Sequence, residues 1–105
     1  MMVIHGLAEH GGRYRDTATF FVDHGWAVYT CDLRSHGLSP DMPGAGRVHV
    51  NRFSDFLLDV EALLGLAKSR HPDLPLYCLG HSMGGLIAQQ VAIRHPSLVK
   101  SLVLA

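Results

Sequence analysis

A serine between glycines is the residue of this chain whose surroundings point most directly to chemistry. Gly80-His81-Ser82-Met83-Gly84 fits the pattern G-x-S-x-G, in which a sharp turn between a strand and a helix exposes a nucleophilic serine. An apolar run precedes the turn, and a segment with helical spacing follows it. The helix N-terminus would point free N–H groups towards the serine. We therefore predict that Ser82 is a nucleophile; the alternative is a glycine-rich turn with a capping serine.

The elements that must position this turn alternate along the chain. Apolar and β-branched runs predict strands at 1–5, 26–33, 74–80 and 99–105. Apolar residues at helical spacing predict helices at 13–23, 51–70 and 83–95, and the glycine- and proline-rich stretch 34–50 predicts a long loop. Because each crossover is long enough for parallel pairing, we expect an α/β fold with four parallel strands and helices on both faces of the sheet.

Composition narrows the classes of function. The 105 residues suffice for a single domain, and nine basic and nine acidic residues cancel, which removes the electrostatic case for nucleic acid or an anionic membrane. The eight histidines form no H-E-x-x-H or similar pattern, so we expect no metal and no cofactor. Cys31 and Cys78 lie in predicted strands without metal or redox spacing, which favours reduced thiols in a cytoplasmic protein.

Three stretches carry a resemblance to a known family. HGLAEHGGRY (5–14), DLRSHGLS (32–39) and GHSMGG (80–85) resemble the loop after the third strand, the D-x-R-G-H-G-x-S loop and the nucleophile elbow of α/β-hydrolases. Within that superfamily they are most similar to the branch of monoacylglycerol lipases and lysophospholipases. The resemblance covers nearly all of residues 1–105 as a single partial domain. The family's leading strands, its lid and its C-terminal triad segment have no counterpart here.

The resemblance implies roles for individual residues. Ser82 matches the nucleophile, which attacks an ester carbonyl to form an acyl-enzyme. The backbone N–H groups of Leu7 and Met83 match the oxyanion-hole donors. Glu9 and Arg13 stand four residues apart and are expected to support the oxyanion loop, or else to form an exposed pair of little energetic value.

This sequence departs from the family at several positions. Ser35 stands where the family has glycine, so a positive φ there would strain the backbone. The triad of the fold runs serine, acid, histidine in chain order, yet no Asp or Glu follows Ser82, and the one later histidine, His95, lies on the helix that leads away from the elbow. His5, His36 and His81 belong to the family's loops and are expected to shape them. We therefore expect this chain alone to turn over esters negligibly.

The family's strand order has consequences for the sheet. It places strand 1–5 between 26–33 and 74–80, which separates Cys31 from Cys78 by two strand spacings and predicts two free thiols. It also leaves 26–33 and 99–105 at the edges, where unpaired backbone groups favour self-association.

The function that the sequence predicts is a serine hydrolase of the carboxylic-ester type, acting on small-molecule acyl esters similar to monoacylglycerols or lysophospholipids. The sequence leaves open a membrane or lipid surface as a further binding partner. Two alternatives remain open: a non-catalytic scaffold or binding fragment that retains the fold, and another activity of the superfamily, such as a peptidase or thioesterase.

Overall fold

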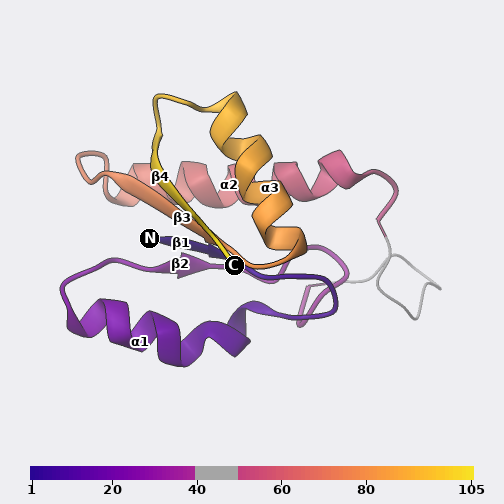
Figure 1. Ribbon diagram of the computed structural model, residues 1–105, viewed down its shortest axis with the longest axis horizontal. Coiled ribbons are helices and arrows are strands. Elements are labelled where there is room, and N and C mark those ends of the chain that lie inside the picture. The colour runs from indigo at the N-terminus through magenta and orange to yellow at the C-terminus, as the bar shows by residue number, and fades with distance from the viewer. Residues whose placement is uncertain (40–49) are drawn as a thin grey trace.

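Four parallel strands in the order β2-β1-β3-β4 form the centre of the molecule (Figure 1). They are β1 (Met2–Ile4), β2 (Tyr29–Thr30), β3 (Leu76–Gly80) and β4 (Val99–Leu104). The computed structural model describes residues 1–39 and 50–105, so most of the predicted loop 34–50 lies outside the described residues. The predicted strand order is confirmed, with β1 between β2 and β3 and with β2 and β4 at the edges.

Helices cover both faces of this sheet, as predicted. A 3-10 turn (Gly11–Tyr14) leads into α1 (Arg15–Asp23), which lies on one face, and α2 (Phe53–Arg70) and α3 (Met83–Arg94) lie on the other (Figure 1). No helix among the described residues is long and apolar enough to cross a membrane. The α/β class expected from the sequence is therefore confirmed.

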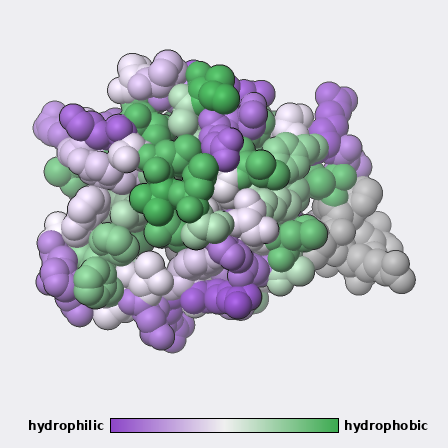
Figure 2. Space-filling model, in the orientation of Figure 1, coloured by the Kyte–Doolittle hydropathy of each residue, from purple (hydrophilic) through white to green (hydrophobic). Residues whose placement is uncertain are grey.

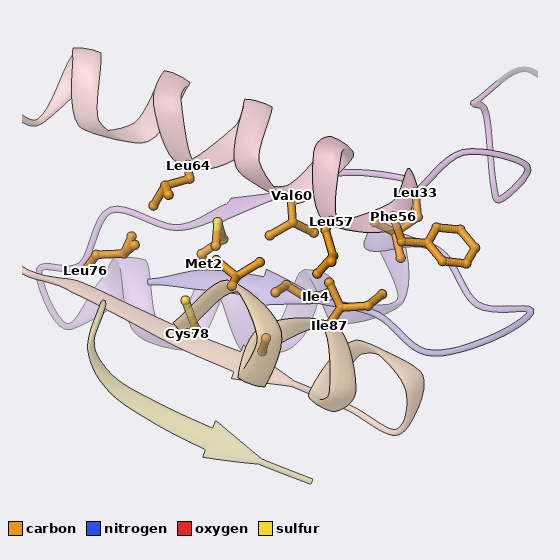
Figure 3. Close-up of a cluster of buried hydrophobic side chains, with 12 residues drawn as sticks. Met2, Ile4, Leu33, Phe56, Leu57, Val60, Leu64, Leu76, Cys78 and Ile87 are labelled. Atoms are coloured by element: carbon orange, nitrogen blue, oxygen red, sulfur yellow. The ribbon is translucent and has the colours of Figure 1, made fainter. Parts of the chain in front are cut away.

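The core lies between the sheet and the pair α2 and α3. Alternate residues of a strand point to the same face, so Met2 and Ile4 of β1 meet Leu76 and Cys78 of β3 under these helices (Figure 3). The helices contribute apolar residues at helical spacing: Phe56, Leu57, Val60 and Leu64 from α2, and Ile87, Ala88 and Val91 from α3. By contrast, α1 contains no buried residue. One face of the sheet therefore carries most of the packing.

The predicted strand 26–33 is too long, because only Tyr29 and Thr30 form ladder pairs. These two residues pair with Met2 and Val3 of β1, which is three residues long. Beyond that point the amide of Leu33 donates to the His5 ring instead of to a strand. β1 extends one residue further, to Ile4, without pairing there with β2, so the strand ends where its backbone turns to the His5 ring, which apolar composition does not reveal.

Both cysteines are free thiols in this fold. Burial raises the pKa of Cys31 to about 11, and burial likewise raises the pKa of Cys78 to about 11. Because the thiolate is the reactive form, neither side chain has the character of a nucleophilic cysteine. Among the side chains that the sequence analysis considered as nucleophiles, Ser82 remains the candidate.

Candidate active site

Ser82 lies on the turn between β3 and α3, with φ 53° and ψ −120°. This backbone conformation is strained for a residue with a side chain, and such strain persists only where the surroundings impose it. Here two close approaches impose it. A Cβ on Gly80 would lie 2.5 Å from the Gly84 carbonyl oxygen, and one on Gly84 would collide with the carbonyl oxygens of Ile4 and His5. The strand–turn–helix geometry expected from G-x-S-x-G is present, and it leaves Ser82 exposed.

Two backbone amides flank this turn. Met83 is the first residue of α3, and Leu7 lies in the loop that follows β1. Gly6 of that loop is so close to the elbow that a Cβ on it would lie 3.2 Å from the His81 carbonyl oxygen. Among the described residues, neither the Leu7 nor the Met83 amide has a hydrogen-bond acceptor. Both amides are therefore available to an oxygen atom at the site, as the resemblance implies.

The Glu9 carboxylate ties the loop to the elbow. Its Oε2 atom accepts from the Gly6 amide at 2.7 Å, lies 3.1 Å from His81 Nδ1 and accepts from the Tyr14 hydroxyl at 3.1 Å. Arg13 lies 2.8 Å from the other oxygen, as expected from the sequence, but only 8% of the Glu9 side chain is exposed. The Glu9 carboxylate is thus largely buried and joins several partners, whereas the Arg13 side chain is 67% exposed; sequence spacing indicated the pair but not the other partners.

Electrostatics keep Glu9 ionised among these partners. Burial alone would raise the pKa of its carboxyl, but hydrogen bonds from Gly6, His81 and Tyr14, with the charge of Arg13, lower that pKa to about 2. Burial, as the larger cause, and the Glu9 carboxylate, as the second, raise the pKa of Tyr14 to about 12. The Glu9 carboxylate therefore stays ionised at neutral pH and well below pH 4.5.

The second family loop is built around Asp32. One carboxylate oxygen accepts from the Gly11 amide at 2.7 Å and the other from the Leu38 amide at 2.8 Å. The Leu38 hydrogen bond is the main reason that the pKa of Asp32 is lowered. Ser35 in this loop has φ 61°, so the positive φ anticipated at the position of the family's glycine is present.

Arg34 anchors the same loop to α2. Its guanidinium approaches both carboxylate oxygens of Asp59, the shortest contact being 2.7 Å, and its backbone amide also donates to Asp59 at 2.9 Å. The sequence analysis missed this pair and the hydrogen bonds of Asp32. The only signal in the sequence was that Asp32 and Arg34 stand at the end of an apolar run. This combination is too common to identify the partner of either side chain.

No base or acid reaches the nucleophile within residues 1–39 and 50–105: the Ser82 hydroxyl makes no hydrogen bond with any described imidazole or carboxylate. His95 follows α3 and lies 3.0 Å from Glu61. The 12 residues of that helix separate it from Ser82 by about 18 Å. The described residues also contain no group of three His, Cys, Asp or Glu side chains that would hold a metal ion.

Comparisons with known proteins agree with this geometry. A protein-family model described as serine aminopeptidase, S33, matches residues 1–105. A monoacylglycerol lipase of Mycolicibacterium smegmatis is 42% identical over 105 residues, which is 100% of this chain and 36% of that protein. Phospholipase YtpA of Bacillus subtilis is 35% identical over 88 residues, covering 84% of this chain and 32% of that protein.

Solved structures give the same result. A thermostable carboxyl esterase from Bacillus coagulans superimposes with a TM-score of 0.86 and 29% identity, over 99% of this chain and 34% of that one. The chain thus spans about a third of the length of each of these relatives.

Proposed function

Because this chain belongs to the serine aminopeptidase S33 family, whose fold is that of the α/β-hydrolases, we propose that it is the nucleophile-bearing part of a serine ester hydrolase. Its substrates are small acyl esters of the monoacylglycerol or lysophospholipid type, in keeping with the relatives named monoacylglycerol lipase and phospholipase. The roles are those that the motifs indicate: Ser82 attacks the carbonyl carbon, and the amides of Leu7 and Met83 stabilise the resulting oxyanion.

One observation carries this proposal: an exposed serine in a strained backbone conformation has two unpartnered amides on the segments beside it. A turn that only capped a helix would need neither the positive φ at Ser82 nor the approach of Gly6 to the elbow. Backbone donors suit an oxyanion because the fold holds them in place before charge develops. A non-catalytic scaffold has no use for this arrangement.

A fluorophosphonate probe tests the proposal on the chain itself. The serine oxygen forms a bond to phosphorus, fluoride leaves, the hydroxyl proton passes to solvent, and the phosphoryl oxygen occupies the oxyanion position. We expect slow labelling of Ser82, no labelling of Ser82→Ala, and no turnover of a short activated ester, because no general base lies beside Ser82 in the part of the chain that the structure describes. Absence of labelling in the folded parent chain would contradict the proposal, and Ser82-dependent turnover would contradict the missing base.

We also propose that the isolated chain associates with itself. Figure 2 shows hydrophobic surface gathered over β4 and beside α3. The exposed apolar side chains there include Leu86, Ile93, Val103 and Leu104, and β4 is an edge strand. Edge strands with apolar side chains pair readily with other chains. Sedimentation velocity should therefore give species larger than a monomer, and Val103→Lys should shift them towards the monomer; a parent chain that stays monomeric at high concentration would contradict this expectation.

A further inference from the structure

We propose that His5 is a positioning residue, whose ring holds the Gly6–Leu7 peptide so that the Leu7 N–H faces the oxyanion. This inference rests on the proposed function, because it explains how one of the two donors is aimed. His5 lies at the end of β1 and is fully buried, so it cannot touch a substrate. It acts through the backbone of its own loop.

The hydrogen bonds of the ring determine its tautomer. The Leu33 amide lies 3.0 Å from His5 Nε2, and a backbone amide can only donate. The Nε2 atom must therefore be an unprotonated acceptor, which leaves the proton of the neutral ring on Nδ1. Burial lowers the pKa of His5, so the ring stays neutral and this tautomer persists.

The protonated Nδ1 atom then donates to the Gly6 carbonyl oxygen at 2.8 Å. That carbonyl and the Leu7 N–H belong to the same peptide plane and, in a trans peptide, point in opposite directions. Holding the oxygen against the His5 ring therefore turns the Leu7 N–H away from that ring. Hydrogen bonds in series also polarise one another, so the chain from Leu33 through His5 strengthens the Leu7 donor.

The Gly6 residue is held from its other side as well. Its amide donates to Glu9 at 2.7 Å, while its carbonyl oxygen also receives the more distant Glu9 amide at 3.4 Å. Ala8, within the same turn, has φ 56°, which is strained for alanine. Both peptide groups that contain Gly6 are thus fixed, and His5 is the side chain that fixes the one carrying the Leu7 N–H.

Two substitutions separate this role from a simple contribution to folding. His5→Asn keeps a donor near the position of Nδ1 and loses the acceptor for Leu33, whereas His5→Gln keeps an acceptor near Nε2 and loses the donor to Gly6. Each variant loses one buried hydrogen bond, so their urea midpoints, followed by Trp26 fluorescence, should fall by similar amounts. Fluorophosphonate labelling of Ser82 should instead diverge, with His5→Asn within about threefold of the parent and His5→Gln slower by about tenfold or more.

The outcomes discriminate between the two proposals. A parent chain that labels, with both variants labelling at rates that follow their urea midpoints, overturns the role of His5 and leaves the proposed function standing. A folded parent chain that does not label overturns both. If neither variant folds, the nitrogen-15 NMR spectrum of the parent decides: a proton on His5 Nδ1, with a bare Nε2 atom at neutral pH, is the expected result, and a proton on Nε2 overturns the inference.

Discussion

The two ends of the sheet differ in what holds them. At the carboxyl ends of the strands, hydrogen bonds of the His5, Glu9 and Asp32 side chains join the loops. His5 and Glu9 are largely or fully buried, and Asp32 is paired with backbone amides. At the amino ends lies an apolar cavity of about 270 Å³, whose walls include Trp26, Tyr77, Leu74 and Ala67. Hydrogen bonds of buried side chains therefore define the site end, whereas at the other end a hydrogen bond between Tyr29 and His71 at 2.8 Å lies beside unfilled apolar volume. Substitutions at the site end should accordingly have larger effects.

The largest effect is expected from Gly84→Ala, because the added Cβ meets the carbonyl oxygens of Ile4 and His5, which cannot move without breaking β1. We expect the free energy of unfolding to fall by about 3 kcal/mol or more. Urea denaturation followed by Trp26 fluorescence measures it.

Gly65→Ala is the matched control for that substitution. Gly65 is exposed in α2, and a Cβ on it meets nothing within 4 Å. The control should stabilise the protein by about 0.5–1 kcal/mol, because alanine loses less conformational freedom in a helix. Equal effects at the two glycines would remove the contrast between the ends of the sheet.

The next effect concerns charge at the site end. The pKa of Glu9 is lowered from 4.5 to about 2, so its contribution to stability is fully present above pH 4.5 and is lost as the pH falls towards about 2. Glu9→Gln should lower the free energy of unfolding by on the order of 2 kcal/mol at neutral pH. Unfolding titrations across this range should show the parent losing its advantage over the variant as acid is added.

Glu61→Gln is the control for charge alone. Glu61 contacts Arg94 at 3.2 Å and His95 at 3.0 Å on the helical surface. Because such exposed pairs contribute little, this substitution should change stability by less than about 0.5 kcal/mol. A Glu61 effect as large as that of Glu9 would show that burial at the site end does not matter.

The smallest effect is a gain. Ser35 has φ 61°, a conformation that disfavours any residue with a Cβ, so Ser35→Gly should stabilise the protein by about 1 kcal/mol. Ser69→Gly in α2 should have the opposite sign, a loss of about 0.5 kcal/mol, because glycine is unfavourable within a helix. Thermal unfolding of both variants tests the pair, and a loss at Ser35 would mean that its side chain outweighs the strain.

Sequence reasoning succeeded where local pattern and physical requirement coincide. The elbow was predictable because the close approach of strand and helix requires residues without a Cβ, and the spacing of Gly80 and Gly84 reveals this requirement. The buried face of α2 was predictable because Phe56, Val60 and Leu64 recur at helical spacing. For Ser35, the family's glycine at this position marked where a positive φ would strain the backbone, and the structure has φ 61° there. These features depend on neighbours within a few residues along the chain.

Long-range partners were not predictable in the same way. The bonds from Glu9 to His81, from Leu33 to His5 and from Arg34 to Asp59 join residues 72, 28 and 25 positions apart. Composition shows which side chains are able to form such bonds, but only the packed sheet selects among many possible acceptors. The short β2 strand has the same cause, since the long-range bond from Leu33 to His5 takes the place of further strand pairing.

The elbow also has a consequence for the order of folding. The His81 amide donates to the Ile4 carbonyl oxygen, and Gly84 packs against the same part of β1, so the turn is completed by residues that are synthesised long before it. Closing a loop of this length carries its full entropic penalty before these contacts form. During synthesis, β1 must therefore wait, unpaired on the β3 side, until β3 and the elbow have left the ribosome. Ser82 acquires its geometry late, which delays any reactivity until the sheet exists.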